Sequence, residues 1–192
     1  MTERRVAVLA GSLRKESFSR KVAAVLASQA PEFLKPKMVE IGTLPLYNED
    51  LEAGQPPEAW RVFRNELAGS DGLLFVTPEY NRSVPAVLKN ALDVGSRPFG
   101  KSVWSRKPGA VMSISSGALG GFGANHHLRQ SLTTLNVRTM QQPEAYIGNV
   151  AALFDEKGGL VSESFREFAV KFMQELDRKS TRLNSSHLAE SR

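Results

Sequence analysis

Hydroxyl and cationic side chains gather in one short segment near the amino terminus, 11-GSLRKESFS-19. The segment follows a short apolar run and precedes an amphipathic pattern, as expected for a strand, a turn and the start of a helix. The free N–H groups of a helix start favour an anion, and Ser12, Arg14, Ser17 and Ser19 could add further donors. The segment lacks both GxGxxG and GxxxxGK[ST], so it favours a terminal phosphate monoester over a dinucleotide or a magnesium triphosphate. The alternative is that a serine only caps the helix and Arg14 lies in solvent.

A second polar segment, 77-TPEYNRSVPAVLKNALD-93, follows another apolar run, which ends at Pro78. Four polar or aromatic residues come next: Glu79, Tyr80, Asn81 and Arg82. A tyrosine ring and a peptide edge can sandwich a flat heterocycle, and an asparagine amide can bond to amide-like edges. The alternative is an ordinary surface loop in which Glu79 and Arg82 form an exposed ion pair.

A third segment, 113-SISSGALGGFGANHHLRQ-130, is rich in glycine, which would let its backbone approach a ligand closely. His126 and His127 are adjacent, so on a helix they point about 100° apart and do not form a metal-chelating pair. We expect no metal here and interpret the two histidines as a surface or interface pair. The sequence also lacks the GxSxG turn of serine hydrolases.

The elements that must position these segments alternate in type along the chain. Apolar patterns predict strands at residues 6–10, 38–41, 72–77, 110–114 and 139–142, with helices at 19–30, 57–68, after Pro85, at 124–136 and near 164–176. Ser164 and Glu167 suggest a capping box for the last helix. This alternation predicts an α/β fold: a doubly wound, five-stranded parallel sheet of order 2-1-3-4-5 in a three-layer α/β/α arrangement. Ligands bind at the carboxyl ends of such strands, so the three segments should form one site.

Length and composition restrict the alternatives. The chain has 192 residues, of which 41% are hydrophobic and 23% charged, and we expect a single domain over residues 1–178. It has no cysteine, which excludes thiol chemistry, and no apolar run of the roughly 20 residues that a membrane span needs. We expect a cytoplasmic protein with no membrane partner. The net charge is +5, but the cations are dispersed, so we expect no nucleic-acid partner. Residues 179–192 form a polar tail, which we expect to be disordered or non-native.

Taken together, GSLRKESFS, TPEYNRSVPAVLKNALD and SSGALGG resemble the NADPH-dependent FMN reductase family, in particular its bacterial chromate, quinone and azo-dye reductases. The resemblance runs from about Val6 to Met173. It implies a flavodoxin-like fold, non-covalently bound FMN, NADPH or NADH as co-substrate, and a homodimer or homotetramer with the flavin near a subunit interface. It also implies a mechanism in which a nicotinamide passes hydride to flavin N5, and the reduced flavin then reduces a quinone, azo compound, chromate or similar small acceptor.

The same resemblance assigns residues to the flavin. Ser12, Arg14, Ser17, Phe18 and Ser19 would line the FMN phosphate, Pro78, Glu79, Tyr80, Asn81 and Arg82 would flank the isoalloxazine and ribityl chain, and Ser115, Ser116 and Gly117 would close the far side. No side chain is assigned as catalytic. Two other functions stay open: a flavodoxin-like electron carrier, which the positive charge disfavours because such carriers are usually acidic, and a non-redox module that binds a phosphate ligand.

Overall fold

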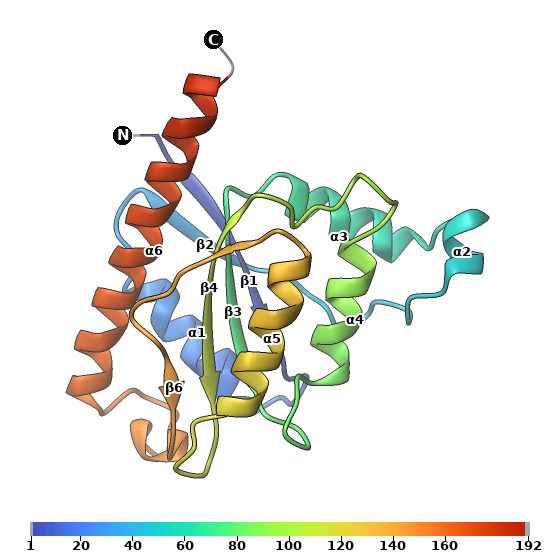
Figure 1. Ribbon diagram of the computed structural model, residues 1–192. Helices are drawn as coiled ribbons and strands as arrows, with labels where there is room; N and C mark the ends of the chain where they lie inside the picture. The colour runs from blue at the N-terminus through green and yellow to red at the C-terminus, as the bar shows by residue number, and fades with distance from the viewer. Residues whose placement is uncertain (1, 191–192) are drawn as a thin grey trace.

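The computed structural model describes residues 2–190, with side chains for residues 2–181. Its centre is a parallel sheet of order β2-β1-β3-β4-β5, in which β6 also pairs with β4 (Figure 1). The strands are β1 Arg4–Ala10, β2 Leu34–Met38, β3 Gly72–Pro78, β4 Pro108–Ile114, β5 Arg138–Thr139 and β6 Tyr146–Ile147. The predicted fold class and strand order are confirmed.

Helices cover both faces of the sheet. The helices are α1 Phe18–Ser28, α2 Glu49–Ala53, α3 Glu58–Ala68, α4 Ala86–Gly95, α5 Phe122–Thr134 and α6 Glu163–Glu190, with a 3-10 turn at Val150–Leu153. Helices α1 and α6 lie on one face, and α3, α4 and α5 lie on the other (Figure 1). Side chains of β1 alternate between the two cores: Val6 and Val8 pack under α1 and α6, whereas Ala7 and Leu9 pack under the other three helices. The three-layer arrangement follows from this burial of both faces.

Two strands differ from the prediction in position. The observed β2 lies before the predicted 38–41 run, because an edge strand needs to bury only some of its side chains. Leu34 is buried while Lys35 and Lys37 are exposed, a pattern that a search for continuous apolar runs misses. The predicted strand at 139–142 is instead split into β5 and β6, which pair with opposite ends of β4. Pro143 lies between the two pieces and has no N–H to donate to a ladder.

The last helix also differs from expectation at both ends. The N–H of Phe165 donates to Ser162 Oγ at 3.2 Å, so Ser162 rather than Ser164 caps the helix. The helix continues to Glu190, where a disordered tail from residue 179 was expected. Ser180 is fully buried and its hydroxyl donates to the Leu176 carbonyl at 2.8 Å. That residues 179–192 are non-native stays a prediction, and residues 191–192 lie outside the described part of the chain. Within that part, α6 and the other helices are too short or too polar to cross a membrane.

Candidate functional site

The three segments singled out by the sequence converge at the carboxyl ends of β1, β3 and β4. They surround a hollow of about 160 Å³. The carboxyl end of β4 lies at the lower end of the molecule in Figure 1. Its lining residues are Ser12, Arg14, Ser17, Phe18, Ser19, Pro78, Glu79, Tyr80, Ile114, Ser115, Ser116 and Val150. Three of the predicted residues do not line the hollow: Asn81, Arg82 and Gly117. The prediction missed Ile114, although it is the last residue of a predicted strand, and Val150, for which the sequence holds no signal.

The first loop brings buried hydroxyls to the start of α1. Ser17 caps this helix, since its Oγ accepts a hydrogen bond from the Arg20 N–H at 3.3 Å, so the capping alternative is correct for this residue. Ser19 is 1% exposed, and its Oγ has no hydrogen-bond partner among the described residues. A buried hydroxyl without a partner is costly, and a bound ligand oxygen would satisfy it. Gly11 lets this loop lie against the end of β3, because a Cβ there would be 3.1 Å from Pro78 Cδ.

The charges around this loop leave one guanidinium available. Arg20 bonds to Glu40 at 2.9 Å, and this bond, with a second from the Gly42 N–H, holds the pKa of Glu40 below its ordinary value of 4.5. Lys21 forms an ion pair with Glu16 at 2.9 Å and lowers the pKa of that carboxyl. Arg14 lines the hollow and, among the described residues, makes no ion pair. Together with the α1 N-terminus and Ser19, it forms a donor set that suits a phosphate monoester.

The second loop is a tight turn. Tyr80 and Ser83 exchange two backbone hydrogen bonds of 3.0 Å, and the residues between them are left-handed, with φ of 50° at Asn81 and 64° at Arg82. This conformation is typical of a two-residue hairpin turn and costs free energy at a residue such as arginine. It directs Asn81 and Arg82 to the tip of the turn, and Arg82 pairs with Glu79 at 3.1 Å with its side chain 75% exposed. The surface-pair alternative therefore describes Arg82 correctly.

Glu79 connects the second loop to the third. Its side chain is 10% exposed and accepts a hydrogen bond of 3.0 Å from the Ala124 N–H, in the first turn of α5. Gly121 precedes this helix and offers no side chain as a cap, so Glu79 caps it from another loop. The third loop is closed by hydrogen bonds from Ser115 Oγ and from the Asn149 N–H to the Gly117 carbonyl, at 2.7 and 3.1 Å. A hydrogen bond thus connects the second loop to the helix that follows the third loop.

The two histidines of α5 face different partners. His126 Nε2 lies 3.1 Å from the Tyr146 hydroxyl, and His127 Nδ1 lies 3.0 Å from Ser83 Oγ. Phe122 packs against His126, with the ring centres 4.2 Å apart, and is about half exposed. Burial and a hydrogen bond to Glu144 raise the pKa of Tyr146. The described residues contain no group of three or more His, Asp or Glu that could hold a metal ion.

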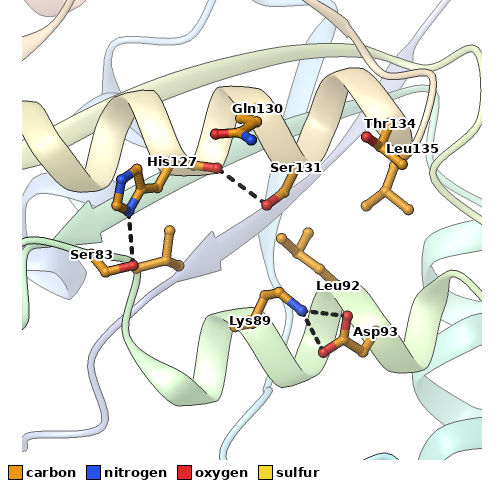
Figure 2. A pocket seen from close by; sticks show the side chains of 10 residues that line it. Ser83, Lys89, Leu92, Asp93, His127, Gln130, Ser131, Thr134 and Leu135 are labelled. Carbon is orange, nitrogen blue, oxygen red and sulfur yellow. Dashed lines mark hydrogen bonds and ion pairs between the residues drawn. The ribbon is translucent and has the colours of Figure 1, made fainter.

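A larger hollow of about 500 Å³ lies between α4 and α5 (Figure 2). Its polar groups bond to one another: Lys89 pairs with Asp93 at 2.7 Å, and Ser131 Oγ donates to the His127 carbonyl at 3.1 Å. Among the described residues, two buried side-chain polar atoms lack a hydrogen-bond partner, Arg4 Nε and Ser19 Oγ. Neither Arg4 nor Ser19 lines the larger hollow. The unsatisfied Ser19 hydroxyl therefore favours the smaller hollow as the ligand site.

The comparison with known families identifies the chemistry of this fold. Residues 4–152 match the family described as NADPH-dependent FMN reductase. The chain belongs to that family. It is therefore a flavin-dependent oxidoreductase of flavodoxin-like fold, and the resemblance noted from its three motifs is confirmed.

Individual relatives agree with this result. The chain is 62% identical over 168 residues to a quinone reductase from Pseudomonas putida, which covers 88% of this chain and 90% of that protein. It is 48% identical over 169 residues to a 2-hydroxy-1,4-benzoquinone reductase from Burkholderia sp, covering 88% and 92%. Among solved structures, it is similar to FerB, a flavoenzyme NAD(P)H:(acceptor) oxidoreductase from Paracoccus denitrificans, with a TM-score of 0.87, 36% identity and coverage of 93% and 98%.

Proposed function

We propose that this chain is an FMN-dependent NAD(P)H:quinone reductase that holds FMN in the hollow at the carboxyl end of the sheet. The observation that carries the proposal is the buried Ser19 hydroxyl, which lacks a partner among the described residues and lies beside Arg14 and the N-terminus of α1. A phosphate oxygen would accept from this hydroxyl and from the guanidinium. Bound FMN supplies the hydride chemistry.

The residues of the hollow would then have separate roles. Ser12, Ser17 and Ser19 would donate hydroxyl hydrogen bonds to the phosphate, and Arg14 would balance its charge. The Pro78–Tyr80 backbone would lie along the flavin ring, and Ser115 and Ser116 would bound its other side. Asn81, Arg82 and Gly117 stay predicted flavin contacts, although they lie outside the lining of the hollow.

The substrates would use the open side of the site. Tyr80 is 47% exposed at the hollow, so its ring offers a flat surface on which a nicotinamide or a quinone could stack. Quinones are our first choice of acceptor because they are named for two relatives, and azo compounds and chromate would need only the same open flavin face. Either NADPH or NADH could be the hydride donor.

We further propose that the chain forms a homodimer or homotetramer and acts in the cytoplasm, as the family resemblance and the sequence suggest. Light scattering of the purified protein would measure the assembly. A mass of one chain at micromolar concentration would contradict the oligomer.

The test of function is a titration of flavin-free protein with FMN, followed by steady-state oxidation of NADPH and NADH with benzoquinone as acceptor. We expect tight binding, a higher melting temperature with FMN, and rapid nucleotide oxidation without an added reductase. Binding of FMN without nucleotide oxidation would favour an electron carrier. No flavin binding at all would favour a non-redox phosphate module.

A further inference from the structure

A buried polar network lies behind the third loop, outside the hollow itself. Ser113 and Asn125 are both 0% exposed. Ser113 Oγ donates to the Gly120 carbonyl at 2.7 Å, and Asn125 Nδ2 donates to Ser113 Oγ at 3.1 Å and to the Ala145 carbonyl at 3.2 Å. Asn125 Oδ1 accepts from Arg129 Nε at 2.8 Å. Every donor and acceptor of the asparagine amide therefore has a partner, as the burial of such a group requires.

This network fixes the point at which the third loop turns back toward α5. Gly120 and Gly121 are left-handed, with φ of 59° and 71°. A Cβ on Gly120 would lie 2.4 Å from the Tyr146 carbonyl carbon, so the backbone passes very close to β6 there. The hydroxyl of Ser113 reaches across the base of the loop to the carbonyl of this turn. Residues 115–119 lie between Ser113 and Gly120, and Ser115 and Ser116 line the hollow. This segment is also bonded to residues 147–150, through the N–H and carbonyl of Ser115 and the carbonyl of Gly117.

We propose that Ser113 and Asn125 are positioning residues that help to hold the wall formed by Ser115 and Ser116 in place against the flavin ring. The proposal rests on the proposed function, because it assigns the wall to FMN. Neither residue lines the hollow, so neither is assigned a contact with the flavin.

When the network is broken, β4 should keep its position while the loop that follows it moves. β4 is held by its ladder to β3, in which Ser113 lies opposite Thr77. Removal of the Ser113 hydroxyl leaves the Gly120 carbonyl and one Asn125 N–H unsatisfied in a buried place, which favours movement of the loop toward new partners. The phosphate loop lies on the other side of the hollow, and within the part of the chain that the structure describes it makes no hydrogen bond to this network. The flavin ring should therefore lose contacts while the phosphate keeps them.

The experiment compares Ser113→Ala with Ser70→Ala. Ser70 is also buried, and its hydroxyl donates to the Leu67 carbonyl at 2.7 Å, but it precedes β3 at the opposite end of the sheet. Both variants lose one buried hydroxyl-to-carbonyl hydrogen bond, and Ser113→Ala also loses the acceptor of Asn125 Nδ2, so its melting temperature should fall further than that of Ser70→Ala. Binding of FMN and of riboflavin, which has the same ring but no phosphate, is measured by fluorescence quenching. We expect Ser113→Ala to weaken both ligands by the same factor, about twofold to tenfold, the scale of one hydrogen bond. Ser70→Ala should weaken neither.

A second variant breaks the network from α5. Asn125→Asp keeps an acceptor for Arg129 but loses both Nδ2 donors and places a buried carboxylate oxygen beside the Ala145 carbonyl, so it should melt below Ser113→Ala. Below its melting temperature it should reproduce the parallel loss for the two flavins. Unchanged flavin affinity in both Ser113→Ala and Asn125→Asp would overturn the proposal, as would an equal loss in Ser70→Ala. Failure of the original chain to bind FMN would instead overturn the proposed function, which the first titration decides separately.

Discussion

Two serines in one turn of α1 differ in what their hydroxyls do. Ser17 accepts a hydrogen bond from the Arg20 N–H, whereas Ser19 lies buried without a partner among the described residues. Sequence alone cannot separate these roles, because serine suits both a helix cap and a phosphate contact. The distinction depends on which rotamer each residue can adopt at the start of the helix, and that becomes visible only in the folded chain.

Substitution of Arg14 distinguishes the contribution of the FMN phosphate to binding from that of the flavin ring. Arg14→Ala should weaken FMN binding by about tenfold to a hundredfold, because hydrogen bonds to charged groups contribute about 1.5–3 kcal/mol. Binding of riboflavin should not change. Isothermal titration of both flavins measures the difference. Lys15→Ala is the control, since Lys15 is exposed and does not line the hollow; an equal loss in that variant would mean that only net charge matters.

At the scale of elements, α1 combines a cap and an anion site. Its first turn holds no acidic residue, which leaves the positive end of the helix free for a ligand. Ser17→Asp should preserve the cap and keep the flavin-free protein at least as stable, because aspartate is a good cap and suits the dipole. The same carboxylate should repel the phosphate and reduce FMN affinity by more than tenfold.

Ser17→Ala is the matched variant for this prediction. It should lower the free energy of unfolding by about 1 kcal/mol, the usual value of a lost cap, with a smaller loss of FMN affinity than Ser17→Asp. Chemical denaturation and FMN titration of both variants provide the comparison. Tight FMN binding by Ser17→Asp would place the phosphate away from α1.

The ion pair between Arg20 of α1 and Glu40, which follows β2, predicts that the stability of the folded chain depends on pH. The pKa of Glu40 is lowered by its bonds from Arg20 and Gly42, so its stabilising effect is present above 4.5 and is lost as the pH falls through the lower folded-state value. Glu40→Gln should therefore melt below the original chain at pH 7, and this difference in melting temperature should shrink as the pH falls below 4.5. Thermal melts across this range test it. A gap that persists in acid would assign the effect to packing instead.

The sequence predicted most helices and strands, but it misplaced the strands at the edges of the sheet. Buried strands such as β3 and β4 are continuous apolar runs, and these were predicted to within two residues. The edge strands were misplaced, because β2 buries only part of its length and β5 and β6 are separated by Pro143. The same limit applies at the site. Asn81 and Arg82 are left-handed and do not line the hollow. Asparagine favours such a turn, but arginine at its second position gave no sign of it in the sequence.

At the scale of the whole molecule, the three loops meet because parallel strands present all their carboxyl ends at one edge. This rule predicted, without any motif, that the three segments would meet, and a hollow lies where they do. It also separates function from stability in space: the C-terminal end of α6 lies at the opposite end of the sheet from the hollow (Figure 1). Changes at that end should alter stability without altering flavin binding.

Two truncations test this separation. A chain ending at Arg178 loses the buried Ser180 but keeps Leu176 and the ion pair between Asp177 and Arg4. A chain ending at Gln174 also loses both of these. Because Leu176 is 0% exposed and Arg4 only 7%, the second chain loses core packing and leaves a buried guanidinium unpaired, each a cost of about 2–5 kcal/mol.

We therefore expect the chain ending at Arg178 to melt within a few degrees of the full chain and to bind FMN with unchanged affinity. The chain ending at Gln174 should melt far lower, with FMN affinity retained wherever it is folded. Differential scanning calorimetry and FMN titration of the three chains measure both quantities. A large drop in the melting temperature on ending at Arg178 would show that residues 179–190 contribute to the folded core, and would contradict the expectation that this segment is dispensable. A loss of FMN affinity without loss of stability would instead couple the two ends of the sheet.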